Sequence, residues 1–134
     1  MNAENAEATA TRLAGKLSQL TSAGKVKWLD AGQLGPWGEG PGQAFKTEVE
    51  DGSFAQIAEV PVPRSLITSY YFGVLEGSRE VFEVFAEGLP AEPTAEQREL
   101  WRTLKNLYLA AKDSARGTWQ IIERFEQGLE RRLA

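Results

Sequence analysis

The segment AFKTEVEDGSFAQIAEV, residues 44–60, decides the fold because it contains two alternating runs around Asp51-Gly52. Apolar and polar side chains alternate on both sides of this dipeptide, which is typical of strands with one buried face. An Asp-Gly pair between two such runs is the strongest short-range signal of a β-hairpin. The sequence therefore predicts antiparallel strands over residues 44–50 and 53–60, joined by a tight turn.

A second hairpin is predicted further along the chain. Residues 69–75 (SYYFGVL) are rich in side chains that favour strands, Glu76-Gly77-Ser78 supplies a turn, and residues 80–85 (EVFEVF) follow. The second arm also fits one and a half turns of helix, because the spacing of its Val and Phe residues suits both structures. We expect the strand and keep the helix as the alternative.

A short strand over residues 25–29 (KVKWL) is expected before the two hairpins, because polar and apolar side chains alternate there. The next segment, GQLGPWGEGPG at residues 32–42, holds five Gly and two Pro. Neither a helix nor a central strand tolerates that density of Gly and Pro. We therefore predict a loop with Trp37 at its middle, placed to contact a partner.

Helices are expected at both ends of the chain. Residues 2–23 carry apolar side chains at three- and four-residue spacing, and Gly24 is a stop signal. After a linker, Thr94 and Gln97 form a capping box at the start of the second helical segment. From there to Leu133 no Pro interrupts an apolar stripe that comprises Trp101, Leu104, Tyr108, Ala111, Ala115, Thr118, Ile122, Phe125 and Leu129.

These elements predict one α+β domain over residues 1–134. It has an N-terminal helix over residues 2–23, an antiparallel β-meander of about five strands within residues 25–86, a linker over residues 87–93 and a long C-terminal helix over residues 95–133. That helix would be about 58 Å long, whereas a seven-residue strand spans about 23 Å. Its C-terminal half therefore folds back after a break near Gly117, packs on the N-terminal helix, or is covered by another chain.

The composition excludes several classes of chemistry. The chain has 134 residues with no Cys and no His, so it lacks thiolate nucleophiles, imidazole bases and the usual zinc ligands. Its formal net charge is -4 and is unevenly distributed. Residues 48–100 hold eleven acidic and three basic side chains, whereas residues 101–134 hold four acidic and seven basic ones. This pattern is that of a solvated surface or, alternatively, of an acidic patch that attracts a basic partner.

Candidate sites for small ligands lack the residues that their chemistry needs. The Gly-rich loop does not match a P-loop, because no Lys-Ser or Lys-Thr follows its glycines. Glu48 and Glu50 share a strand face, but a glycosidase or hard-metal site needs its carboxylates in a pocket with positioned partners. We assign no catalytic residue, no cofactor and no metal.

A sheet surface for single-stranded nucleic acid is a further alternative. Trp28, Phe45 and the aromatic residues 70–72 could stack on bases beside nearby lysines. The sequence pI of about 5.0 and the acidic middle of the chain oppose binding to phosphate, so nucleic acid is not the expected partner. No apolar run approaches about 18 residues, so a membrane is not expected either.

Two apolar regions are the strongest candidates for contact with another protein. Tyr70, Tyr71 and Phe72 are consecutive, and neighbouring strand residues face opposite sides, so either both faces of the sheet are covered or one ring is exposed. The C-terminal half of the helical stripe is the second region. The interface predicted from the sequence comprises Trp37, Tyr70, Tyr71, Phe72, Trp119, Ile122, Phe125 and Leu129.

The sequence therefore favours a small, acidic, non-enzymatic protein-interaction module, such as an adaptor, an inhibitor or a chaperone-like protein. We expect it to form a homodimer through its C-terminal helix and, because residues 1–12 lack the pattern of a secretory signal, to be cytoplasmic. In size, acidity and element order the chain resembles the small acidic chaperones of bacterial secretion systems, a resemblance of general architecture that assigns no site residue. The alternatives are a ligand-binding or carboxylate-dependent enzyme domain near residues 32–42, and the nucleic-acid binder.

Overall fold

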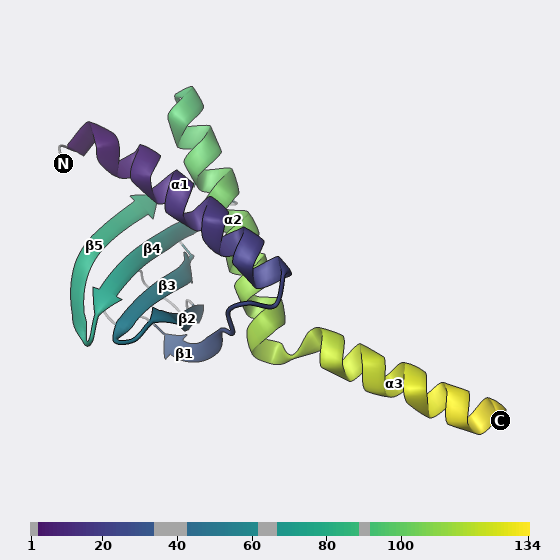
Figure 1. Ribbon diagram of the computed structural model, residues 1–134. Coiled ribbons are helices and arrows are strands. Elements are labelled where there is room, and N and C mark those ends of the chain that lie inside the picture. Colours follow the sequence, from purple (N-terminus) through teal and green to yellow (C-terminus); the bar gives the residue numbers. More distant parts are fainter. Residues whose placement is uncertain (1–2, 34–42, 62–66, 89–91) are drawn as a thin grey trace.

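The computed structural model describes residues 3–33, 43–61, 67–88 and 92–134, without the side chains of residues 3–5 and 118–120. It confirms the expected α+β layout, in which an N-terminal helix precedes a five-stranded antiparallel sheet and C-terminal helices follow it (Figure 1). The elements are α1 (Ala3–Ser22), β1 (Leu29–Gln33), β2 (Gln43–Glu50), β3 (Ser53–Val60), β4 (Ser69–Glu76), β5 (Arg79–Ala86), α2 (Ala95–Arg116) and α3 (Thr118–Leu133).

The sheet is a meander in which each strand pairs with its neighbours in sequence, in the order β1-β2-β3-β4-β5. Glu50 pairs with Ser53, so Asp51 and Gly52 form the tight turn that the sequence predicts. Gly52 has φ 79°, a conformation that a residue with a side chain rarely adopts. The register pairs Phe45 with Ile57, and both side chains are buried on the same face of the sheet.

The second predicted hairpin is also confirmed. Residues 80–85 lie within strand β5 and not in a helix, and Glu76 pairs with Arg79 around the turn formed by Gly77 and Ser78. The two hairpin turns lie side by side, because the backbone N–H of Gly77 donates a hydrogen bond of 2.7 Å to the carbonyl oxygen of Gly52. Strand pairing thus outweighs the helical spacing of the Val and Phe residues in β5.

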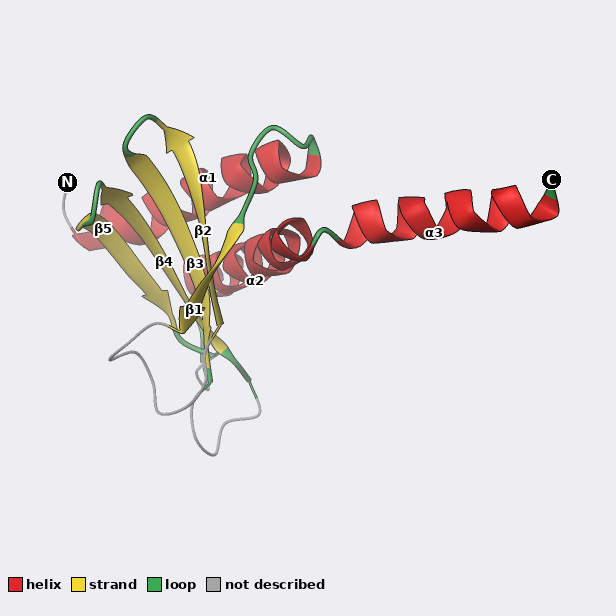
Figure 2. Ribbon diagram, turned by 90° about the horizontal axis from the view of Figure 1, so that it is seen from below, coloured by secondary structure: helices red, strands yellow, loops and turns green. Residues whose placement is uncertain are grey.

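Both α1 and α2 cover the same face of the twisted sheet (Figure 2). The helix-facing side chains of the strands meet those of α2 in one buried cluster around Phe45, Phe72 and Leu104, each with 0% exposure. Ala10 and Ala14 of α1 are also fully buried in that cluster. Their short side chains let α1 pack closely on α2, which leaves the larger residues to fill the space above the sheet.

The opposite face of the sheet has a second, smaller buried cluster of Ala44, Ala58, Val60 and Tyr71. Tyr71 pairs with Ala58 across the strands and leans along β4 over Gly73. A Cβ atom at Gly73 would collide with the Tyr71 hydroxyl, so this glycine makes room for the ring. Large side chains of β4 are therefore buried on both faces of the sheet.

The strand predicted over residues 25–29 is wrong in position, because β1 begins at Leu29 and extends to Gln33. Helix α1 ends in a Schellman motif, in which the N–H of Lys25 donates to the carbonyl of Leu20 and Gly24 has φ 71°. The backbone N–H of Trp28 then donates to Ser114 Oγ of α2 at 3.1 Å. The chain from Gly24 to Trp28 is thus used to connect α1 with the sheet and α2, and it is not free to pair as a strand.

The long C-terminal helix is a single element in the sequence prediction and two elements in the structure. Its start is confirmed, because Thr94 and Gln97 form the reciprocal capping box. The helix then breaks at Gly117, which adopts the left-handed conformation with φ 62° and ψ 34° and caps both α2 and α3. The helical segment expected over residues 95–133 is therefore divided at Gly117, the position near which the sequence leaves a break open, and Gly takes there a conformation that costs other residues energy. After this break α3 extends away and does not fold back (Figure 1).

Candidate protein interface

Helix α3 extends away from the rest of the molecule beyond its junction with α2 (Figures 1 and 2). Its large apolar side chains are consequently exposed to solvent. The exposed fractions are 54% for Ile121, 45% for Ile122, 68% for Phe125, 48% for Leu129 and 86% for Leu133. Isolated exposed apolar residues are ordinary in proteins, but five on one helix form a continuous surface.

The exposed apolar residues gather on one face of α3. At about 100° per residue, the five side chains and Gly128 fall within an arc of roughly 140°. Arg132 also lies within this arc, near the C-terminal end of the helix. We call this set of residues the α3 face; it comprises Ile121, Ile122, Phe125, Gly128, Leu129, Arg132 and Leu133.

The two edges of the α3 face carry opposite charges. Glu123, Glu126 and Glu130 follow one edge, whereas Arg124 and Arg131 follow the other, by the same 100° rotation per residue. No Glu of α3 has a Lys or Arg four residues later, so the helix lacks the charge pairs that stabilise a solvated helix from within. These charges are therefore available to groups on another chain.

The predicted interface residues do not all lie in the same environment. Ile122, Phe125 and Leu129 lie together on the α3 face and are exposed, as the interface prediction requires. Trp119 lies in α3, but its side chain is not among the described atoms. Trp37 lies outside the described residues. The prediction omitted Ile121 and Leu133, although their spacing from Phe125 by four and eight residues places them on the same face.

Tyr70, Tyr71 and Phe72 are not part of an exposed surface, and their prediction as interface residues is wrong. Their exposed fractions are 5%, 2% and 0%. Tyr70 and Phe72 pack under the helices and Tyr71 packs on the opposite face, so the sheet is covered on both sides at this strand. Side chains buried within one chain cannot contact a partner unless the domain opens.

The same burial removes the aromatic side chains on which the nucleic-acid alternative depended. Trp28 and Phe45 are 1% and 0% exposed, so neither ring can stack on a base.

Tyr70 and Tyr108 lie in the core with ring centroids 5.6 Å apart. Burial raises the pKa of Tyr70, with a further contribution from the charge of Glu59, and burial raises the pKa of Tyr108 to about 12.

Acidic side chains come together at one place on β5, where Glu80 and Glu83 interact. Desolvation raises the pKa of Glu80, and the hydrogen bond and the charge of Glu83 raise it further. Both residues are exposed on the strand, so this pair of carboxylates is solvated. Within the described part of the chain, no three acidic, His or Cys side chains gather closely enough to hold a metal ion.

Comparisons with known proteins provide no functional assignment. No protein-family model, no curated protein and no solved structure matches this chain. Among the described residues, no helix has both the length and the apolar character needed to cross a membrane.

Proposed function

We propose that this chain is a non-enzymatic protein-interaction module that associates with a second copy of itself through the α3 face. The observation that carries the proposal is the exposure of five large apolar side chains on one helix, which extends away from the body of the molecule. Phe125, the largest of them, is 68% exposed at the centre of the face. Aromatic residues in such central positions are the usual anchors of protein interfaces.

A partner would add to the stability of the helix itself. Isolated helices shorter than about 12–15 residues are marginal in water, and α3, which extends from the body, is only slightly longer at 16 residues. Covering a Leu, Ile or Phe side chain completely contributes about 1.5–3 kcal/mol. A partner that covers the α3 face therefore stabilises the helix and removes its apolar surface from water in one step.

The proposal is tested by charging the α3 face. Ile122→Asp combined with Phe125→Asp places two carboxylates in the proposed contact, where a desolvated charge costs several kcal/mol unless it is paired. We expect sedimentation equilibrium to show a dimer for the wild type and a monomer for this variant. Circular dichroism should show that the sheet and α2 remain folded, because neither residue packs on them.

The matched control is Gln127→Asp, which adds a carboxylate to the polar side of the same helix. Gln127 lies opposite the α3 face, so this variant should associate as the wild type does. A wild type that stays monomeric up to the highest soluble concentration contradicts the proposal. So does a double variant that associates as strongly as the control.

A further inference from the structure

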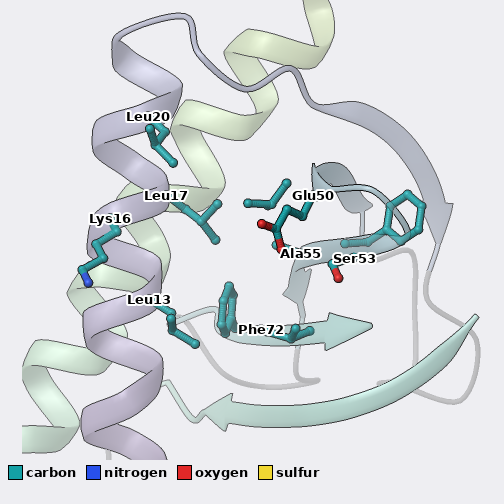
Figure 3. Close-up of a pocket in the computed structure, with 11 residues that line it drawn as sticks. Leu13, Lys16, Leu17, Leu20, Glu50, Ser53, Ala55 and Phe72 are labelled. Carbon is teal, nitrogen blue, oxygen red and sulfur yellow. The ribbon is translucent and has the colours of Figure 1, made fainter. Parts of the chain in front are cut away.

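An apolar groove opens between α1 and the sheet, close to the turn that joins β2 and β3 (Figure 3). Its volume is about 320 Å³. Leu13, Leu17 and Leu20 of α1 point toward the sheet, and Phe72 forms part of the opposite wall. The groove is open to solvent and is lined almost entirely by hydrocarbon, so it resembles a site for apolar side chains more than a polar ligand site.

Building on the proposed self-association, we propose that this groove receives the α3 face of the second copy, while the groove of the second copy receives α3 of the first. The lengths agree. Leu13 and Leu20 are seven residues apart on α1, and Ile122 and Leu129 are seven residues apart on α3, about 10 Å in each case. Phe125 lies between the latter two and is the side chain that fills the groove.

The charges of the groove and of the α3 face are complementary. Glu50 lies beside the groove, and Figure 3 shows its carboxylate turned inward between the two walls, whereas the amine of Lys16 points away from the groove. The groove is thus an apolar surface with one inward carboxylate. The α3 face is an apolar surface with one cation, Arg132. Pairing these two surfaces places a guanidinium within reach of Glu50, a contact that Arg forms in a planar, bidentate geometry.

A reciprocal exchange also accounts for the size of the contact. A stable interface usually buries roughly 800 Å² per partner, and α3, with 16 residues, presents only one of its faces to a groove. Two-fold symmetry repeats the contact, because each chain contributes both an α3 face and a groove. Pairing of α3 with α3 of the second copy uses only one such contact and leaves both grooves open.

Charge exchange between Glu50 and Arg132 tests the inference. Glu50→Arg and Arg132→Glu each bring like charges together, and we expect each to weaken dimerisation at least about tenfold in sedimentation equilibrium. The chain that carries both changes should recover to within about threefold of the wild type. Glu83→Arg makes the same charge change on the opposite face of the sheet, and its dimerisation should be unchanged.

Cross-linking provides an independent measurement, because the chain has no Cys of its own. Chains with Glu50→Cys and chains with Arg132→Cys are mixed and oxidised, and each Cys must come close to its counterpart for a disulfide to form. We expect a cross-linked dimer of the two different variants in the mixture and little product from either variant alone.

The result that overturns the groove contact differs from the result that overturns the proposed function. Glu50→Arg could dimerise as the wild type does while the double variant Ile122→Asp with Phe125→Asp is monomeric. In that case α3 associates without the groove, so this inference is wrong and the proposed function stands. If the wild type is monomeric, both are wrong. Cross-linking of Arg132→Cys chains mainly with each other assigns the contact to paired α3 helices and also overturns the inference.

Discussion

Helices α2 and α3 share one amphipathic stripe in the sequence, yet they have opposite environments in the structure. Leu104 and Leu107 of α2 are fully buried, whereas Phe125 of α3 is 68% exposed. The difference follows from length: the eight-residue strands span about 26 Å, and the 22 residues of α2 span about 33 Å. Helix α2, which lies beside α1 on the sheet, is therefore already longer than the strands, and no strand surface remains for α3. The comparison teaches that periodicity identifies an apolar face but does not identify what covers it.

The largest expected effect comes from truncating equivalent leucines in the two helices. Leu104→Ala removes a fully buried side chain and leaves a cavity, so we expect a loss of about 2–5 kcal/mol in the free energy of unfolding. Leu129→Ala removes a half-exposed side chain and should change that free energy by no more than about 0.5 kcal/mol when the protein is dilute and monomeric. Urea melts monitored by circular dichroism measure both values.

Protein concentration extends this comparison. Leu129→Ala should lose the concentration dependence of unfolding that dimerisation gives the wild type, whereas Leu104→Ala should keep it. Equal destabilisation by the two substitutions in dilute solution would mean that α3 packs within its own chain, and the contrast between the helices would then be incorrect.

A smaller effect is expected from the buried phenol of Tyr108 in α2. Its pKa is raised from 10.0 to about 12 in the folded chain, mainly by burial. Between pH 10 and 12 the unfolded chain therefore releases this proton more readily than the folded chain, and stability falls as the pH rises. We expect Tyr108→Phe to reduce the slope of unfolding free energy against pH in this range.

The control for the alkaline experiment is Phe125→Asp in α3, which should keep the slope of the wild type because no core phenol is changed. Tyr70 contributes to the slope in the same direction, since burial raises its pKa as well. Equal slopes for the wild type and Tyr108→Phe would show that the phenol of Tyr108 ionises alike in the folded and unfolded chains.

The sequence was sufficient where local chemistry determines the structure. Gly52 has the positive φ that the Asp-Gly turn requires, and Thr94 and Gln97 form the predicted capping box. Both signals depend on residues within three positions of each other. They predict the hairpin and the start of α2 without any knowledge of the rest of the chain.

Prediction failed where contacts distant in sequence decide the outcome. Trp28 is held by Ser114 of α2 through its backbone and by Thr21 of α1 through its indole, so its alternating neighbours do not form a strand. The exposure of residues 70–72 could not be decided from alternation alone, because burial on the second face depends on the rest of the fold. The groove likewise unites α1 with strands that begin more than twenty residues later.

The interface prediction named exposed side chains only where helical spacing determined the face, and their role as an interface stays a prediction. Ile122, Phe125 and Leu129 were chosen because they follow the helical stripe, and they are exposed together in the structure. The stripe continues through Gly117 without a change of period, so the periodicity provided no sign of the break. A glycine within a helical pattern is compatible both with continuation and with a cap.

The smallest and last predicted effect concerns this break, which separates the two environments. In Gly117→Ala the left-handed conformation costs roughly 1–2 kcal/mol, and a right-handed conformation removes that cost by joining α2 and α3 into one helix of about 58 Å. We therefore expect the variant to straighten with a change in unfolding free energy of about 1 kcal/mol or less. Spin labels on Lys112→Cys and Glu130→Cys in the same chain should then report a longer distance than in the wild type.

Because the straightened helix directs the α3 face elsewhere, reciprocal docking into the grooves should weaken, whereas simple pairing of α3 helices should not. An unchanged label distance with unchanged dimerisation would show that Ala tolerates the bend, and the break would then be determined by the contacts of α2, such as the one between Trp28 and Ser114, and not by the glycine.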